Sequence, residues 1–289
     1  MPKIGLVVLN FITYNDTYET IKSLSNSNSN SNVYIYIVDN KTDNKKYRHL
    51  KNQLLNLNLN YKIIYLSSED NLGFAKGMNI GIDKARKDGC THIICSNNDI
   101  QYNKKIDFNK FINIYNKDKK IAVIGPKILN PDCLNQNPYM IKKRLPTELY
   151  DRIKQKIIFT NIIGKYIFML RGIIRSRINR NDHIKEKLSD SDYVYCLHGS
   201  YFILTPAYFG FYKNLDSNTF LYVEELILAE RVQIKGLKKY YYNDIEVFHK
   251  DDSATNEMLG KDSLNKILFI LNENYKSLQY FMKEYIWKR

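Results

Sequence analysis

The 289-residue sequence predicts an α/β fold with a mainly parallel sheet and helices on its flanks. Three observations support this class. Over the first 125 residues, short apolar runs alternate regularly with stretches that have helical spacing. The apolar runs are rich in Val, Ile and Tyr, which are enriched in strands. Each connection is long enough for the crossover helix that two neighbouring parallel strands require.

The elements of this first part follow in order along the chain. The apolar runs predict strands at Ile4–Leu9, Val33–Val38, Tyr61–Leu66, His92–Cys95 and Ile121–Ile124. The stretches between them predict helices at about residues 16–25, 44–57, 74–88 and 104–117. The low-complexity repeat at Ser25–Asn32 indicates a lengthened surface loop before the second strand.

Residues 126–190 interrupt this alternation with an irregular, proline-containing stretch and then a basic helical region. Strand-like sequence returns at Tyr193–Cys196, Tyr201–Leu204 and Lys238–Phe248, around a helix at Glu224–Lys235. Apolar residues at helical spacing over Ser263–Trp287 predict an amphipathic helix. We therefore expect one α/β domain over residues 1–255, with an insertion at 126–190, followed by a helical tail at 256–289.

The positive charge is concentrated in one segment. The formal net charge is +14, and residues 140–187 hold 13 Lys and Arg against 4 Asp and Glu, a net +9. Either this segment is a solvated helical face, or its cations and apolar residues attach to an anionic membrane surface. Nucleic acid is not expected as a partner, because no zinc-finger spacing, RNP-like strand or helix-turn-helix pattern is present.

Cysteine usage and hydropathy indicate a cytoplasmic protein. The four cysteines show no paired spacing, which is typical of free thiols in a reducing compartment. The first strand begins without a secretory signal pattern, and no apolar run reaches the roughly 18–20 residues of a membrane span. We expect the protein to be cytoplasmic and peripheral at the inner face of the plasma membrane.

Polar residues follow each of the first four predicted strands. They are Asn10, Asp39-Asn40, Asp70-Asn71 and Asp99. Any one of them alone is typical of a turn or a helix cap. Ligands of open α/β sheets bind outside the carboxyl ends of the strands, so four such ends at one edge favour a binding cleft. The loop after the third strand is neither a dinucleotide fingerprint nor a Walker loop, because its glycines lack both spacings.

The chain resembles a family 2 glycosyltransferase in ordered blocks between about residues 3 and 255. The blocks are LVVLNFITYNDT (6–17), IVDN (37–40), NLGFAKGMNIG (71–81), SNND (96–99), HGSYFIL (198–204), FLYVEELILAER (220–231) and VFHKDDSAT (247–255). They are most similar to the rhamnosyltransferase-like branch that builds bacterial surface polysaccharides. The resemblance implies a GT-A fold, with a nucleotide-sugar-binding half at residues 1–125 and an acceptor half at residues 191–255. It also implies inversion at the anomeric carbon.

On the donor side, the resemblance assigns residues to a nucleotide-sugar. Asp39 matches the position that binds the donor base, and Asn10 lies beside it. The residues that match the donor-binding loop and helix are Asp70, Asn71, Gly73 and Asn79.

The resemblance also implies a divalent metal, Mn²⁺ or Mg²⁺. Asp99 matches the last acid of the family's D-x-D motif, and Asn97 departs from the acid two residues earlier. Asn97 is counted here with the donor-binding residues. His249 ends an apolar strand, where a lone histidine is usually structural, but the family pattern places a histidine near the diphosphate or metal. It would supply the ligand missing at Asn97, and the cation would neutralise the departing diphosphate.

Inverting transfer needs a carboxylate that takes the proton from the acceptor hydroxyl. By residue type alone, Glu224-Glu225 is an ordinary acidic helix N-terminus. The resemblance makes Glu225 the catalytic base and Glu224 the reserve, and it places Gly199-Ser200 on the acceptor side. The implied acceptor is a glycan or lipid-linked glycan.

Two other functions are compatible with this sequence. One is a nucleotidyltransferase that makes a sugar nucleotide, although no Gly-rich, basic triphosphate loop follows the first strand. The other is a catalytically inactive scaffold in a polysaccharide assembly complex, which the departure at Asn97 permits. The tail helix is compatible with internal packing and with a homodimer.

Overall fold

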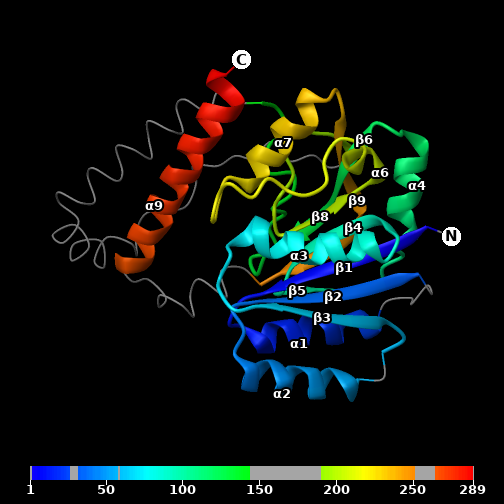
Figure 1. Ribbon diagram of the computed structural model, residues 1–289. Helices are drawn as coiled ribbons and strands as arrows, with labels where there is room; N and C mark the ends of the chain where they lie inside the picture. The colour runs from blue at the N-terminus through cyan, green and yellow to red at the C-terminus, as the bar shows by residue number, and fades with distance from the viewer. Residues whose placement is uncertain (1, 27–31, 58, 144–189, 251–263, 289) are drawn as a thin grey trace.

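The computed structural model of the chain describes residues 2–26, 32–57, 59–143, 190–250 and 264–288 (Figure 1). The strands are β1 (Lys3–Asn10), β2 (Val33–Asn40), β3 (Lys62–Ser68), β4 (Cys90–Asn97), β5 (Ile100–Gln101), β6 (Ile121–Leu129), β7 (Asp192–Tyr193), β8 (Tyr201–Leu204) and β9 (Lys238–His249). The helices are α1 (Tyr14–Ser23), η1 (Leu24–Asn26), α2 (Asn44–Leu55), α3 (Phe74–Lys87), α4 (Asn109–Lys117), α6 (Pro206–Phe209), α7 (Glu224–Ile234), α9 (Leu264–Phe281) and the π-helical η2 (Met282–Trp287).

The strands of the described residues form one nine-stranded sheet in the order β3-β2-β1-β4-β8-β6-β9-β5, and β7 pairs with β9. Strands β3, β2, β1 and β4 are parallel to one another. Strand β8 is antiparallel to both β4 and β6, and it joins this parallel half to the parallel pair of β6 and β9. The predicted α/β class with a large, mainly parallel sheet and flanking helices is confirmed. Since β1, β2 and β4 run in one direction, their carboxyl ends share one edge.

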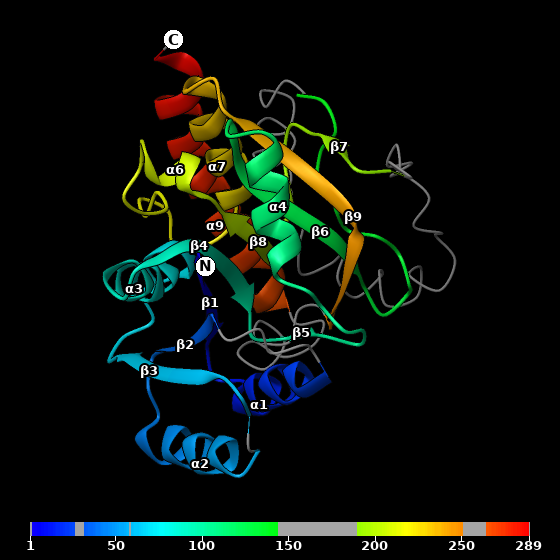
Figure 2. The same ribbon diagram turned by 90° about the vertical axis from the view of Figure 1, so that its right-hand side faces the viewer.

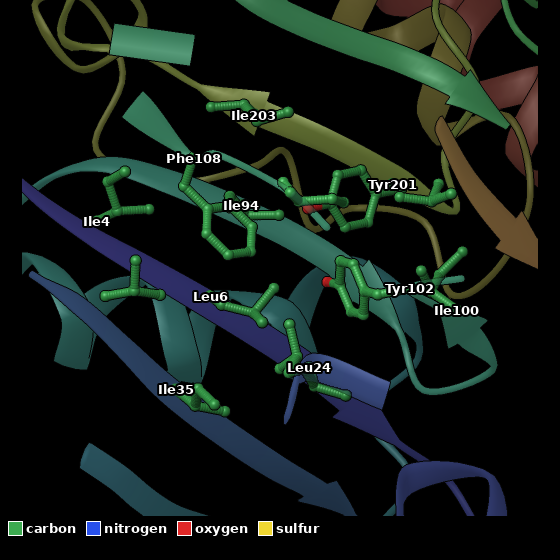
Figure 3. Close-up of a cluster of buried hydrophobic side chains, with 14 of the residues drawn as sticks. Ile4, Leu6, Leu24, Ile35, Ile94, Ile100, Tyr102, Phe108, Tyr201 and Ile203 are labelled. Atoms are coloured by element: carbon green, nitrogen blue, oxygen red, sulfur yellow. The ribbon is translucent and has the colours of Figure 1, made fainter. Parts of the chain in front are cut away.

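Helices cover both faces of the parallel half. Helices α1 and α2 lie against one face, and α3 lies against the other (Figures 1 and 2). Consecutive residues of β1 alternate between two buried clusters: Leu6 and Val8 pack with one, and Val7 packs with the other. Figure 3 shows the first cluster, in which Leu6 lies near Tyr102. Helix α3 approaches β1 closely, because a Cβ atom on Gly81 would lie 2.2 Å from Val7 Cγ1.

Several elements differ from their predicted bounds. Helix α1 begins two residues earlier than predicted, and helix α4 begins at Asn109, later than predicted. Strand β6 continues through Pro126, although proline usually ends a central strand. Its register against β9 shifts between Pro126 and Lys127, and this irregularity accommodates the residue without an N–H. The two-residue β5 and the four-residue α6 were not predicted, because such short elements have no detectable periodicity.

The predicted tail helix packs on the body of the protein. Leu278, Phe281, Met282 and Tyr285 form a buried cluster with residues of α7, among them Leu226. The basic segment 140–187 lies almost entirely outside the described residues, and so does the centre of the polar repeat. Within the described part of the chain, no helix is long and apolar enough to cross a membrane.

Candidate active site

The carboxyl ends of β1 and β2 are joined by a buried carboxylate. Asn10 Nδ2 donates to Asp39 Oδ1 at 2.6 Å, and the Tyr14 hydroxyl donates to Asp39 Oδ2 at 2.9 Å. Asp39 is fully buried, so burial raises its pKa, while the hydrogen bonds from Asn10, Tyr14 and Thr42 oppose that rise. The structure therefore brings together the two residues that the resemblance assigned to the donor base.

Asn98 links this pair to the end of β4. Its Nδ2 atom lies within hydrogen-bonding distance of Asn10 Oδ1 (3.0 Å), Thr13 Oγ1 (2.8 Å) and Thr17 Oγ1 (3.0 Å). Its carbonyl accepts a hydrogen bond from Thr20 Oγ1 at 2.6 Å. Asn98 thus fastens α1 to the two strand ends. Asn98 was not predicted as a site residue. Its hydrogen-bond partners become apparent only once β1 and β4 are known to be neighbours in the sheet.

The third loop is held by Asn40. Its Nδ2 atom donates to Asn71 Oδ1 and to the Gly73 carbonyl, each at 3.0 Å, and its Oδ1 accepts from Leu72 N at 2.9 Å. Asp70 is exposed, and its backbone carbonyl accepts a hydrogen bond from Ser68 Oγ at 2.8 Å. The loop is therefore shaped by amide side chains, and the Asp70 carboxylate lies on its outer surface.

Two residues of this region face the segment before α7. Gly73 has a φ of 80°, in the left-handed region, and a Cβ atom there would lie 2.2 Å from the Phe220 carbonyl oxygen. Asn79 donates to the Leu215 carbonyl at 3.0 Å and accepts from Leu215 N at 2.9 Å. Both amide atoms of Asn79 are therefore bound to backbone. In this arrangement Asn79 positions a loop, and Gly73 permits a close approach between two backbones.

Asp99 and His249 face one another at the end of β4. His249 Nε2 lies 3.3 Å from Asp99 Oδ1, a buried oxygen that accepts no hydrogen bond from the residues that the structure describes. Gln136 Oε1 lies 2.8 Å from His249 Nδ1. An amide oxygen only accepts, so Nδ1 carries a proton in this arrangement. Nε2 then either holds a second proton, directed at Asp99 Oδ1, or presents a lone pair to it, and in the second case a cation between the two atoms would relieve their repulsion.

These two residues fit a divalent cation. An octahedral ion with ligands at about 2.0–2.1 Å places adjacent ligands roughly 3 Å apart, close to the observed separation of 3.3 Å. A metal-binding histidine usually donates its other ring N–H to an oxygen, as His249 does to Gln136. No group of three or more His, Cys, Asp or Glu side chains is gathered for a metal in the described ranges.

Residues 198–200 connect this pair to the two glutamates. His198 Nδ1 lies 2.9 Å from Ser200 Oγ, and the rings of His198 and His249 are 5.7 Å apart. The Ser200 carbonyl accepts from Asn97 N at 2.8 Å. On the other side, a Cβ atom on Gly199 would lie 2.5 Å from Glu225 Oε1. Residues 198–200 therefore lie between Asp99 and His249 on one side and Glu225 on the other, and His198 was not predicted as a site residue.

Helix α7 begins with the glutamate pair in an unusual backbone setting. The two residues before it, Tyr222 and Val223, have φ values of 68° and 71°. Non-glycine residues in this left-handed region cost about 1–3 kcal/mol each and are concentrated at functional sites. The strained turn ends the preceding segment and starts the helix, so the glutamates occupy its first turn.

Both glutamates lie in a poorly solvated environment. Glu224 and Glu225 line a pocket between α7 and the sheet, together with apolar residues such as Leu197 and Phe202. Burial raises the pKa of both carboxyls, and the charge of Glu225 raises that of Glu224 further. Glu224 Oε1 is buried without a hydrogen-bond partner. A carboxylate in this setting is a stronger base than an exposed one.

The fold is shared with solved glycosyltransferase structures. S. aureus TarS 1-349 in complex with UDP has a TM-score of 0.53 and 11% identity, over 99% of this chain and 73% of that one. GalNAc-T7 with UDP, GalNAc and Mn²⁺ has a TM-score of 0.58 and 12% identity, over 100% of this chain and 57% of that one. A second S. aureus TarS structure has a TM-score of 0.53 and 12% identity, over 99% of this chain and 44% of that one. At these identities the likeness shows a GT-A-type fold.

The family is shown by the sequence itself. The family described as glycosyl transferase family 2 matches residues 6–177, which is more than half of the chain. No curated protein matches the sequence significantly. The chain therefore belongs to glycosyl transferase family 2.

Proposed function

We propose that the chain is an inverting, metal-dependent glycosyltransferase of the rhamnosyltransferase-like branch. It transfers a sugar from a nucleotide-diphosphate donor, dTDP-rhamnose or a UDP-sugar, to a hydroxyl of a growing, lipid-linked bacterial surface glycan. Membership of glycosyl transferase family 2 supports the reaction class. The single observation that carries the metal-dependent form is the buried Asp99 Oδ1, which faces His249 Nε2 at 3.3 Å.

Asp99 and His249 are the residues that would hold the cation. When bound, Mn²⁺ or Mg²⁺ supplies positive charge that stabilises the departing nucleoside diphosphate. The Mn²⁺ in the GalNAc-T7 structure, which shares this fold, supports the proposal of a divalent cation. Because Asn97 contributes no charge, Asp99 is the only acid of this motif, and we expect metal affinity to depend on the donor's own phosphate oxygens.

The donor is bound along the carboxyl edge of the parallel strands. Asp39 and Asn10 form the base end of this site, and the loop at Asn71–Gly73 borders it. Each carboxylate oxygen has two lone pairs, so Asp39 has the capacity to accept an N–H of the base beside the N–H of Asn10 and the O–H of Tyr14. The UDP bound in the TarS and GalNAc-T7 structures is consistent with a nucleotide in this fold.

Glu225 removes the proton from the attacking hydroxyl. The new bond forms between the acceptor oxygen and the anomeric carbon while the bond to the donor phosphate breaks. The hydroxyl proton moves to the Glu225 carboxylate, whose burial makes it more basic. The lack of a side chain at Gly199 allows this carboxylate to lie against the backbone, because a Cβ atom there would approach Glu225 Oε1 to 2.5 Å. Gly199 and Ser200 then form the acceptor side.

We also propose that residues 140–187 attach the enzyme to the inner face of the plasma membrane. The net +9 charge of this segment suits an anionic surface, where each nearby Lys or Arg contributes about 1 kcal/mol. A lipid-linked acceptor would be reached there. Sedimentation with vesicles tests this proposal. We expect more protein to sediment with vesicles that contain 30% phosphatidylglycerol than with neutral vesicles, and equal binding to both would contradict the proposal.

The test of the proposed function is a thermal-shift panel of UDP-glucose, dTDP-rhamnose and GDP-mannose, each with and without Mn²⁺. A ligand that binds the native state stabilises it by about 2.7 kcal/mol at one hundred times its Kd. We expect one donor to raise Tm clearly above the others, and Mn²⁺ to increase that rise. Production of a sugar nucleotide from a nucleoside triphosphate would instead establish a nucleotidyltransferase. Absence of any donor-dependent shift would support an inactive scaffold.

A further inference from the structure

The segment Leu215–Val223, named here the bridging segment, leads directly into the glutamate pair of α7. It is fastened at several points by residues distant in the sequence. Some of these contacts come from the donor-binding loop and helix, and others come from the C-terminal helices α9 and η2. The inference below rests on the proposed function, because it concerns the placement of the base Glu225.

On one side, the bridging segment is bound to the donor region. Asn79 of α3 holds the Leu215 backbone through both of its amide atoms, at 2.9 and 3.0 Å. The Phe220 carbonyl accepts from Phe74 N at 3.0 Å, directly after Gly73. The loop that borders the donor site is therefore in direct backbone contact with the segment that precedes the catalytic helix.

On the other side, the C-terminal helices bind Asp216. The hydroxyls of Tyr280 and Tyr285 both donate to Asp216 Oδ2, the first at 2.9 Å. Asp216 Oδ1 accepts from the backbone and side chain of Asn218, at 3.1 and 2.8 Å. Burial alone would raise the pKa of Asp216, but the hydrogen bonds from Tyr285, Asn218 and Tyr280 outweigh it and lower the pKa. Asp216 is therefore ionised, and its carboxylate ties both tyrosines to the bridging segment.

A second contact lies next to the strained turn. Ser277 of α9 is buried, and its Oγ atom donates to the Leu221 carbonyl at 2.7 Å. The two residues that follow Leu221 are Tyr222 and Val223, both with positive φ. A strained backbone persists only where its surroundings hold it in place. Figures 1 and 2 show α9 beside α7, and the two helices share a buried cluster around Leu278 and Phe281.

We propose that Ser277, Tyr280 and Tyr285 are positioning residues of the active site. They hold the bridging segment against the donor loop, and the strained turn at Tyr222 and Val223 then sets the direction of the Glu225 side chain. The C-terminal helices are accordingly part of the catalytic apparatus, although none of the three residues touches substrate. The same connection couples the donor loop to the base, since Phe220 contacts that loop and lies five residues before Glu225.

Two variants and one matched control test this role. Ser277→Ala removes the hydroxyl beside the strained turn, and the double variant Tyr280→Phe/Tyr285→Phe removes both donors to Asp216. Tyr242→Phe is the control, because Tyr242 also donates to an aspartate, Asp244, at 3.0 Å on another part of the surface. Each protein is assayed for hydrolysis of UDP-glucose, dTDP-rhamnose and GDP-mannose, for donor Kd by calorimetry, and for amide exchange of residues 222–226.

We expect both test variants to lower kcat on the order of 10- to 100-fold, the range for a base displaced by up to about 1 Å. Donor Kd should stay within about twofold, because the donor-binding residues are intact. Amide exchange over residues 222–226 should accelerate in both test variants and not in Tyr242→Phe. Unchanged kcat and exchange would overturn the proposal, and so would an equal effect of Tyr242→Phe. If the wild type hydrolyses none of the three donors, the proposed function fails and amide exchange alone decides the positioning role.

Discussion

Gly199 offers a direct way to displace the catalytic base without removing it. A methyl group at this position would lie 2.5 Å from Glu225 Oε1 and 3.0 Å from its Cδ. Ordinary contact begins at 3.4 Å, so the Gly199→Ala substitution forces the carboxylate to withdraw by about 0.9 Å. The contact is to the end of a flexible side chain, so stability should change little.

The expected effect is on kcat. A displacement of about 1 Å can reduce the rate roughly 100-fold, equivalent to about 2.7 kcal/mol of transition-state stabilisation. Donor hydrolysis and donor Kd are measured for Gly199→Ala and for the control Gly210→Ala. Gly210 has a helical φ of −67°, and a methyl group there meets only ordinary contacts at 3.5 and 3.7 Å. A folded Gly199→Ala variant with kcat within about twofold of wild type would refute the placement of Glu225.

Two further predictions concern the cation site and the second glutamate. Asp99→Asn should abolish the Mn²⁺-dependent part of the donor-induced rise in Tm. Asp107→Asn, at an exposed position, is the control and should retain it. An unchanged Mn²⁺ effect in Asp99→Asn would contradict the assignment of Asp99 and His249 to the cation. Glu224→Gln should raise the free energy of unfolding at pH 8 but not at pH 4. The pKa of Glu224 is raised in the folded state, so the wild type loses stability as pH rises above the unfolded value of about 4.3, and the uncharged variant does not. Urea unfolding of both proteins at the two pH values tests this. An unfolding free energy that differs between Glu224→Gln and the wild type by the same amount at both pH values would contradict it.

The part of the site that could be predicted from sequence depends on strand ends. The alternation of apolar runs and helical stretches predicts parallel strands, and parallel strands place their carboxyl ends at one edge. The observed hydrogen bond between Asn10 and Asp39, and that between Asn40 and Asn71, follow from this geometry. The local sequence pattern was sufficient to predict these positions, because each of these residues lies at or next to the end of a strand with a clear apolar run.

Other features could not be predicted because they depend on contacts between distant residues. Asn98 is one polar residue of a tetrapeptide, and its partners follow from the order of β1 and β4 in the sheet. Asp216 is bound by Tyr280 and Tyr285, which are 64 and 69 residues away. The amphipathic spacing of α9 predicts only that one face is buried. It does not show which polar hydroxyls of that face bind the segment before the catalytic helix.

The same limit applies to the residues named by resemblance alone. Asn79 matches a donor-binding helix, yet its amide holds the Leu215 backbone at both atoms. Asp70 matches the donor loop, and its side chain is exposed. Their assignment to the donor site remains a prediction, and the contacts observed for Asn79 favour a role in shaping the site over direct contact with the nucleotide.

The central claim is that Glu225 removes the acceptor proton in a nucleotide-sugar transfer. Glu225→Gln keeps the size of the side chain, and it removes the base. We predict that this variant loses transfer and donor hydrolysis while its donor Kd, measured by calorimetry with Mn²⁺, stays within about twofold of wild type. Undiminished turnover in Glu225→Gln would contradict the account.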